Sequence, residues 1–177
     1  MKNFVFLSPN FPETYWMFCR ELKNNGMRVL GIGDCPYDAL KAELRESLHE
    51  YYKVSNLSNY EEVFRAVAFF TYKYGKIDWL ESNNEFWLEQ DARLRTEFHI
   101  TTGFMEGDME KVKRKSAMKE YYAKAGIPTA RYHLVEGYEE AAAFANMVGY
   151  PVVVKPDNGV AVELRGTSAK MYLRGRL

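Results

Sequence analysis

The sequence predicts an α/β protein: a doubly wound, mostly parallel sheet followed by an incomplete α+β piece. Three observations carry this prediction: strand-type and helix-type segments alternate over the first hundred residues, glycine ends several of them, and the pattern changes near residue 105. Such alternation is typical of parallel strands joined by crossover helices on both sheet faces. We expect one domain over residues 1–104, a linker and basic helix over 105–128, and the opening part of a second domain over 129–177.

Four strand–helix units make up the predicted first domain. Short apolar runs predict the strands, and apolar residues three or four positions apart predict the helices. Asn59 is a favourable N-cap, and Gly26 and Gly75 follow two helical segments and predict their ends. In chain order, strand first, the alternating segments are Asn3–Leu7, Glu13–Asn25, Met27–Ile32, Tyr37–Leu48, Tyr51–Val54, Asn59–Tyr74, Ile77–Leu80 and Asn84–Phe98.

The second half is predicted to continue with a long basic helix, a strand, an alanine-rich helix and a strand rich in valine. These segments are Asp108–Ala125, Thr129–Val135, Tyr138–Met147 and Pro151–Pro156. The tail from Ala161 onward has no clear amphipathic period. We therefore expect the second domain not to close a core of its own within this chain.

Composition excludes several classes of protein. The 24 Lys and Arg residues balance 24 Asp and Glu residues, which argues against a nucleic-acid or membrane-surface binder. No apolar run reaches the length that crosses a bilayer. Cys19 and Cys35 form no CxxC pair, and each is expected to be a reduced thiol. We expect a cytoplasmic protein with no nucleic-acid or membrane partner.

Polar loops follow three of the predicted strands, and parallel sheets bind ligands at this edge. The loops are Ser8–Asn10, Gly31–Asp34 and Glu81–Asn84. Ordinary strand–helix connections have the same composition, so both interpretations stay open. The candidate substrate contacts are Asn10, Glu81, Asn83 and Asn84.

Common catalytic and nucleotide motifs are missing or broken. Gly31 and Gly33 match part of a dinucleotide fingerprint, but Pro36 stands where its third glycine belongs. The sequence contains no GxxxxGK[ST] phosphate loop and no GxSxG nucleophile motif. The three histidines have no metal-ligand spacing, and we expect no metal site in this chain.

The remaining candidate binding residues in the sequence are lysines. Lys111, Lys115 and Lys119 share one face of the predicted helix, where a solvated surface is the ordinary interpretation and a nucleic-acid patch the second. Lys155 ends a run of valines and is not expected to remain unpaired in a core. Two lysines from separate elements would together neutralise a triphosphate.

Several segments resemble the start of the ATP-grasp superfamily, the ATP-dependent carboxylate–amine ligases that include biotin carboxylase and the carbamoyl phosphate synthase large subunit. The segments are KSAMKEYYAKAGIP (115–128), Thr129–Arg131 and GYPVVVKPDNGV (149–160). Residues 1–104 resemble the Rossmann-like pre-ATP-grasp domain, whose E-x-N-like loop is similar to Glu81–Glu85.

The resemblance implies that Lys115 and Lys155 bind ATP and that Mg²⁺-ATP activates a carboxylate as an acyl phosphate. Asp157–Val160 begins the glycine-rich loop of that family, but Ala161–Leu164 does not continue it. The metal ligands and the catalytic arginine would lie further along. We therefore expect a truncated or frame-disrupted chain that is inactive alone and binds ATP weakly.

Two alternatives stay open. One is a nucleotide-binding domain of another enzyme class, such as an oxidoreductase, although the broken glycine fingerprint speaks against it. The other is a non-catalytic interaction module built on residues 1–104.

An incomplete second domain would also expose apolar surface, which favours self-association into a homo-oligomer.

Overall fold

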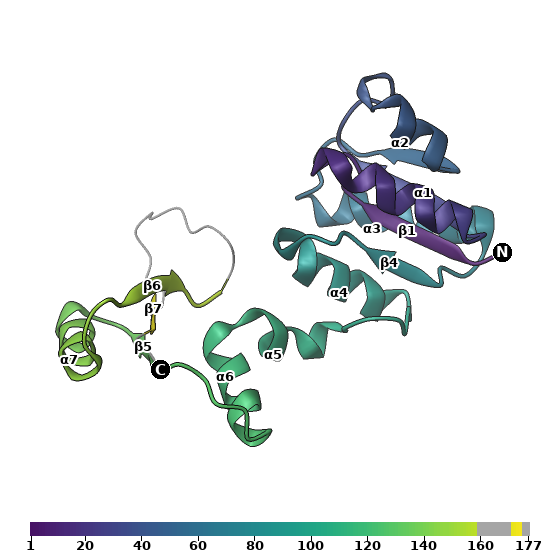
Figure 1. The fold of residues 1–177 in the computed structure, drawn as a ribbon. Helices are drawn as coiled ribbons and strands as arrows, with labels where there is room; N and C mark the ends of the chain where they lie inside the picture. Colours follow the sequence, from purple (N-terminus) through teal and green to yellow (C-terminus); the bar gives the residue numbers. More distant parts are fainter. Residues whose placement is uncertain (159–170, 175–177) are drawn as a thin grey trace. The chain divides into compact units, whose positions relative to one another are not determined.

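A computed structural model of the protein describes residues 1–158 and 171–174. The continuation of the loop that begins at Asp157, and most of the tail after Ala161, lie outside the described residues. The chain divides into two compact units, Met1–Glu106 (unit 1) and Gly107–Leu177 (unit 2) (Figure 1). Among the described residues, no helix is long and apolar enough to cross a membrane.

Unit 1 contains a four-stranded, fully parallel sheet, as predicted. Its strands are β1 (Asn3–Leu7), β2 (Arg28–Gly33), β3 (Glu50–Lys53) and β4 (Trp79–Glu81). They lie in the order β3–β2–β1–β4, so the order reverses at β1. Every residue of β1 is buried, because this strand is apolar on both faces and lies inside the sheet.

Four helices cover the two faces of this sheet: α1 (Trp16–Asn24), α2 (Ala42–Ser47), α3 (Tyr60–Tyr74) and α4 (Leu88–Glu97). Alternate residues of a strand point to opposite faces. Phe4 and Phe6 pack in one core with Cys19 of α1 and Leu44 of α2. On the other face, Val5 and Leu7 of β1 pack with residues of α3 and α4. The doubly wound architecture is therefore confirmed.

Three predicted helices begin differently from expectation. Each starts with a short 3₁₀ turn: η1 (Glu13–Tyr15), η2 (Tyr37–Ala39) and η3 (Glu85–Trp87). Leu40, Leu44 and Leu48 still reach one core, although only Leu44 lies within α2. Burial of these leucines therefore follows the four-residue spacing even where the backbone is not α-helical.

Unit 2 contains three helices and a three-stranded antiparallel sheet among its described residues. The helices are α5 (Met109–Lys113), α6 (Lys115–Lys124) and α7 (Tyr138–Val148), after a 3₁₀ turn, η4 (Glu106–Asp108), at the boundary of the units. The strands are β5 (Tyr132–Val135), β6 (Val153–Pro156) and β7 (Met171–Arg174), in the order β5–β7–β6. Sequence analysis assigned no element to the tail, where the structure has β7, because this strand is defined by pairing with two distant segments.

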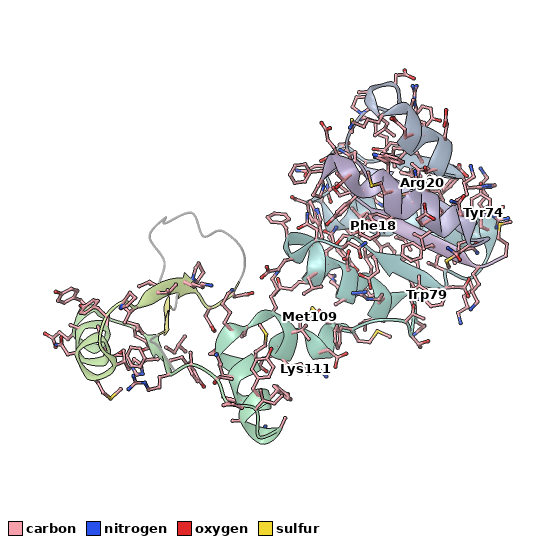
Figure 2. All side chains as sticks on the ribbon, in the orientation of Figure 1. Phe18, Arg20, Tyr74, Trp79, Met109 and Lys111 are labelled. Carbon is pink, nitrogen blue, oxygen red and sulfur yellow. The ribbon has the colours of Figure 1, made fainter. Side chains whose placement is uncertain are left out.

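The single basic helix predicted over Asp108–Ala125 is also wrong. Arg114 has extended backbone angles (φ −83°, ψ 119°) and separates α5 from α6. Its backbone forms a bridge to Asn158 instead of continuing the helix. Lys111, labelled in Figure 2, lies on α5 and pairs with Asp108, whereas Lys115 and Lys119 lie on α6, so the three lysines do not share one continuous helix.

A buried arginine stabilises the end of unit 1. Arg95 of α4 is 1% exposed, and its guanidinium donates to the carbonyl of Leu80 (3.1 Å) and to that of Phe104 (2.9 Å). It also forms an ion pair with Glu81 at 2.7 Å. Removing this cation would leave a half-buried carboxylate and two carbonyls without their donor.

We predict that Arg95→Met destabilises unit 1 by about 3–5 kcal/mol, the cost of breaking a buried ion pair. Urea unfolding followed by tryptophan fluorescence measures this, because the three tryptophans all lie in unit 1. The matched control is Arg65→Met, since Arg65 is exposed and its distance to Glu61 is 4.0 Å. It should change the unfolding free energy by less than about 0.5 kcal/mol. Equal effects would contradict the prediction.

Candidate functional site

Two loops that sequence analysis singled out follow the neighbouring strands β1 and β4, where the strand order reverses. The hydroxyl of Tyr15, at the end of η1, donates to the carbonyl of Asn83 at 2.5 Å. This hydrogen bond joins the segment after β1 to the loop after β4. The structure thus brings Asn10 and the Glu81–Asn84 loop to one edge of the sheet, the edge at which doubly wound folds bind ligands.

The four predicted substrate contacts differ in how they are held. Glu81 is paired with Arg95, and the side chain of Asn84 accepts from the backbone N–H of Phe86 at the start of η3. Asn83 is exposed and has a positive φ of 54°. The Oδ1 atom of Asn10 is buried and has no hydrogen-bond partner among the described residues. Asn83 is therefore more available to a ligand than Glu81 and Asn84, whereas the Oδ1 atom of Asn10 has almost no accessible surface.

Asp91 is a candidate that sequence analysis missed. It lies in the first turn of α4, fully buried, and its Oδ2 accepts from the N–H (3.0 Å) and hydroxyl (2.5 Å) of Ser82. Burial raises the pKa of Asp91 to about 7, and the nearby Glu81 adds to this increase. Arg95 and the bonds from Ser82 lower it. An aspartate on a charged helix gives no sequence signal for this environment, which arises from the loop folding back onto α4.

Unit 2 positions Lys115 beside the end of β6. Asp157, which follows β6, is buried, and its carboxylate accepts from the N–H (2.7 Å) and the hydroxyl (2.8 Å) of Ser116. The carbonyl of Asp157 accepts from the N–H of Lys115 at 3.0 Å. Asp157 therefore accepts from two backbone N–H groups at the start of α6, which would otherwise have no partner within the helix. Because Asp157 directly follows β6, these bonds hold the N-terminus of α6 next to the strand that carries Lys155.

Lys155 lies on β6 and is exposed, and so are Val153 (45%) and Val154 (47%). The argument that Lys155 leaves a buried valine strand is therefore wrong. Successive strand residues point to opposite faces, so β6 is covered on neither side by the described residues. The common role of Lys115 and Lys155 stays a prediction.

Cys19 is part of the core on one face of the sheet. Cys19 is buried, and desolvation raises the pKa of its thiol to about 12, which removes it as a nucleophile. Residues 1–158 contain no group of three or more His, Cys, Asp or Glu side chains that could hold a metal ion.

Comparison with known proteins supports the sequence resemblance. No family model matches the chain. The carbamoyl phosphate synthase large chain of Methanothermobacter thermautotrophicus is 36% identical over 59 residues, which are 32% of this chain and 6% of that relative.

Solved structures match nearly the whole chain. An L-amino acid ligase from Bacillus licheniformis (TM-score 0.69, 17% identity) and the N5-carboxyaminoimidazole ribonucleotide synthetase of Thermotoga maritima (0.67, 19%) match over 99% of this chain. The biotin carboxylase domain of Hydrogenobacter thermophilus 2-oxoglutarate carboxylase, solved with MgADP, ADP and bicarbonate, matches over 89% (0.66, 23%). The chain spans 44%, 46% and 35% of these three structures. It has the fold of this part of ATP-grasp ligases, as the sequence resemblance predicted.

We predict that the ionisation of Asp91 makes unit 1 less stable as pH rises. Its folded pKa exceeds the unfolded value, so its stabilising contribution is complete below about pH 4 and is lost as pH rises through about 7. Asp91→Asn should remove this part of the pH dependence, on the order of 4 kcal/mol at most. Urea unfolding at several pH values, followed by tryptophan fluorescence, measures it. The exposed-site control Asp38→Asn should keep the wild-type pH profile; an unchanged profile in Asp91→Asn would refute the assignment.

We predict that Asp157 fixes the start of α6. Asp157→Ala should cost about 1–2 kcal/mol of local stability, because two donors of Ser116 lose their acceptor. Hydrogen exchange at the amides of Lys115 and Ser116 measures this as faster exchange. Glu120→Gln, an exposed change on the same helix, serves as the control and should leave both amides protected. Unaltered protection in Asp157→Ala would show that α6 begins without this contact.

Proposed function

We propose that this chain is the ATP-binding part of an ATP-grasp ligase that activates a carboxylate for attack by a nucleophile. The observation that carries the proposal is the link made by Asp157, which holds the first turn of α6, with Lys115, beside the end of the strand that carries Lys155. The fold match to ATP-dependent ligases over nearly the whole chain supports it.

Lys115 and Lys155 are proposed to bind the phosphates of ATP. Lys155 is exposed, so its ammonium can reach a ligand without a prior loss of core packing. Two lysines provide the charge neutralisation that a triphosphate needs as negative charge shifts during phosphoryl transfer.

The proposed reaction is formation of an acyl phosphate. A carboxylate oxygen attacks the γ-phosphorus of ATP, the bond to the bridging oxygen breaks, and ADP leaves with that electron pair. A nucleophile then displaces phosphate from the acyl group. The described residues contribute charge and orientation to these steps.

Mg²⁺ is a further part of this proposal, and the described residues do not fit it, because they form no cluster of metal-binding side chains. We derive no step through the metal from this chain.

We also propose that the chain does not turn over by itself, since it spans less than half of the matched ligases. Self-association stays a prediction, supported by the exposed valines of β6.

Asn10, Glu81, Asn83 and Asn84 are proposed to contact the carboxylate substrate from unit 1. Their support is their common position at the edge of the sheet where the strand order reverses. Glu81 and Asn84 would act mainly by shaping the loop, because each has a partner within the protein.

We predict weak ATP binding by the full chain that depends on both lysines. Lys115→Ala and Lys155→Ala should each weaken binding about tenfold or more, as loss of a charged phosphate contact does. Isothermal titration with ATP measures the affinity. Lys124→Ala, which removes an exposed charge elsewhere on α6, is the matched control and should keep wild-type affinity. Lack of ATP binding, or equal losses in all three variants, would refute the proposed site.

A further inference from the structure

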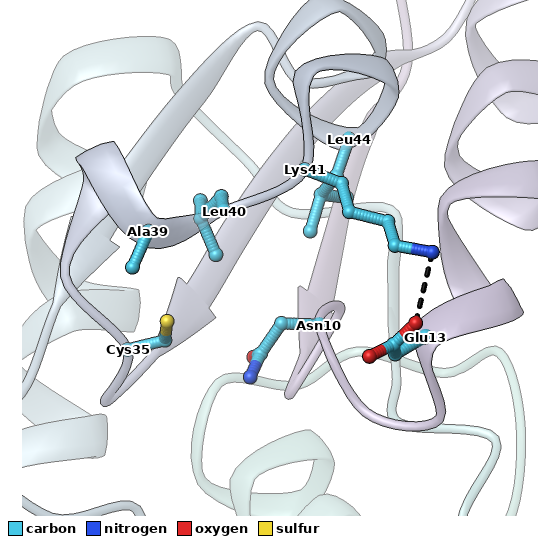
Figure 3. Close-up of a pocket in the computed structure, with 7 residues that line it drawn as sticks. All are labelled: Asn10, Glu13, Cys35, Ala39, Leu40, Lys41 and Leu44. Atoms are coloured by element: carbon cyan, nitrogen blue, oxygen red, sulfur yellow. Dashed lines mark ion pairs between the residues drawn. The ribbon is translucent and has the colours of Figure 1, made fainter.

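A pocket of about 210 Å³ lies in unit 1, between the segments that follow β1 and β2 and the start of α2 (Figure 3). Its charged groups are Glu13 and Lys41, which are exposed and pair with each other at 2.9 Å. Its leucines, Leu40 and Leu44, are 4% and 2% exposed, so they offer a ligand little apolar surface. The less ordinary chemistry of unit 1 lies around Asp91, beside the loop that follows β4.

Two carboxylates and one buried cation lie together beside this loop. The guanidinium of Arg95 pairs with Glu81 at 2.7 Å and donates to the carbonyl of Phe104 at 2.9 Å. Asp91 and Arg95 are four residues apart on α4, so they share one face of the helix. The charge of Arg95 therefore also acts on Asp91. With both acids ionised, one arginine would face two carboxylates.

The two acids differ in their access to water. The side chain of Glu81 is 28% exposed, whereas Asp91 is 0% exposed. The Oδ2 atom of Asp91 accepts both hydrogen bonds from Ser82, but its Oδ1 atom is buried and has no hydrogen-bond partner among the described residues. Water can hydrate a bare carboxylate at Glu81 but not at Asp91. A single cation therefore stabilises an ionised Asp91 more than it stabilises Glu81.

The groups that set the charge of Asp91 come from several elements. Burial raises the pKa of Asp91 to about 7, while the hydrogen bonds from Ser82 lower it. Glu81 of β4 raises it further, and Arg95 of α4 lowers it. Tyr15 of η1 is the titratable group that reaches the loop from the other side, because its hydroxyl donates to a loop carbonyl. Asp91 thus changes its charge close to neutral pH.

We propose that Arg95 exchanges carboxylate partners as pH changes. While Asp91 holds a proton, the guanidinium pairs with Glu81, as in the structure described above. When Asp91 releases this proton to solvent, the guanidinium turns to its Oδ1 atom, and the carboxylate of Glu81 becomes open to a ligand at the edge of the sheet. The exchange itself requires no ATP, and it rests on the proposed function only in making Glu81 a substrate contact.

The test is an NMR titration of the full chain without ligand, from about pH 5 to about pH 9. The carboxyl carbon signals report the ionisation of Asp91 and the surroundings of Glu81, and the guanidinium nitrogen signals of Arg95 report its partner. The signal of Asp91 should shift with a midpoint near pH 7. The signals of Glu81 and Arg95 should shift with the same midpoint. An Asp91 with a merely structural role would titrate without moving Arg95.

Variants separate the exchange from a general effect of charge. Asp91→Asn should abolish the shared midpoint in the signals of Glu81 and Arg95. Glu81→Gln should lower the midpoint of Asp91 by about one pH unit, because it removes a neighbouring negative charge and releases Arg95. The matched control is Glu97→Gln, because Glu97 is another acid paired with an arginine of α4, Arg93, at 3.1 Å. This variant should keep the wild-type midpoint.

The proposal is overturned if Asp91 does not titrate over this range, if Arg95 and Glu81 keep constant signals while it does, or if Glu81→Gln and Glu97→Gln have equal effects. The wild-type titration requires no variant, so it decides the question even where a variant fails to fold. ATP titration of the same sample keeps the two proposals apart. Lack of ATP binding refutes the nucleotide function and not the exchange, whereas lack of a shared midpoint refutes only the exchange.

Discussion

The contact between Asp157 and the first turn of α6 is the interaction on which the candidate nucleotide site depends. It joins residues 41 positions apart and fixes where α6 begins relative to the end of β6. The backbone break at Arg114 belongs to the same contact, because Arg114 pairs with Asn158 while Lys115 bonds to Asp157. A continuous helix would have rotated Lys115 to another position, so the break and the lysine site have one cause.

A similar arrangement organises the loop after β4 in unit 1. The guanidinium of Arg95 forms an ion pair with Glu81 at 2.7 Å. The carboxylate of Asp91 instead accepts two hydrogen bonds from Ser82, one from its N–H and one from its hydroxyl. The loop is thereby attached to α4 at two adjacent residues, Glu81 and Ser82. Glu81 contacts a cation of the helix, and Ser82 contacts an acid of the helix. Glu81 has a buried cation as its partner, whereas burial holds Asp91 near its ionisation midpoint at neutral pH. The next residue, Asn83, accepts the hydrogen bond from the hydroxyl of Tyr15 with its own carbonyl.

The sequence predicted the parallel sheet of unit 1 well, because its strands are buried apolar runs and its helices have apolar faces, both of which are local signals. Long-range pairing explains the failures. The tail strand β7 exists by pairing with β5 and β6, and the break at Arg114 is set by Asn158. The lysines could be selected from the sequence through the family resemblance, whereas Asp91, Asp157 and the pocket beside Asn10 could not, since their environments form only after folding.

The exposed side chains of β6 indicate which chemical groups a ligand of this strand would need. Val153 and Lys155 point to one side of the strand and Val154 to the other. A ligand that buries this strand must therefore place apolar surface on valine and an anion on lysine within a few residues of each other. Free inorganic phosphate satisfies only the lysine, and a purely apolar partner would leave its ammonium desolvated at a cost. A nucleotide has both a flat base and a charged phosphate chain, so the exposure of Lys155 beside Val153 is compatible with the proposed role of Lys155.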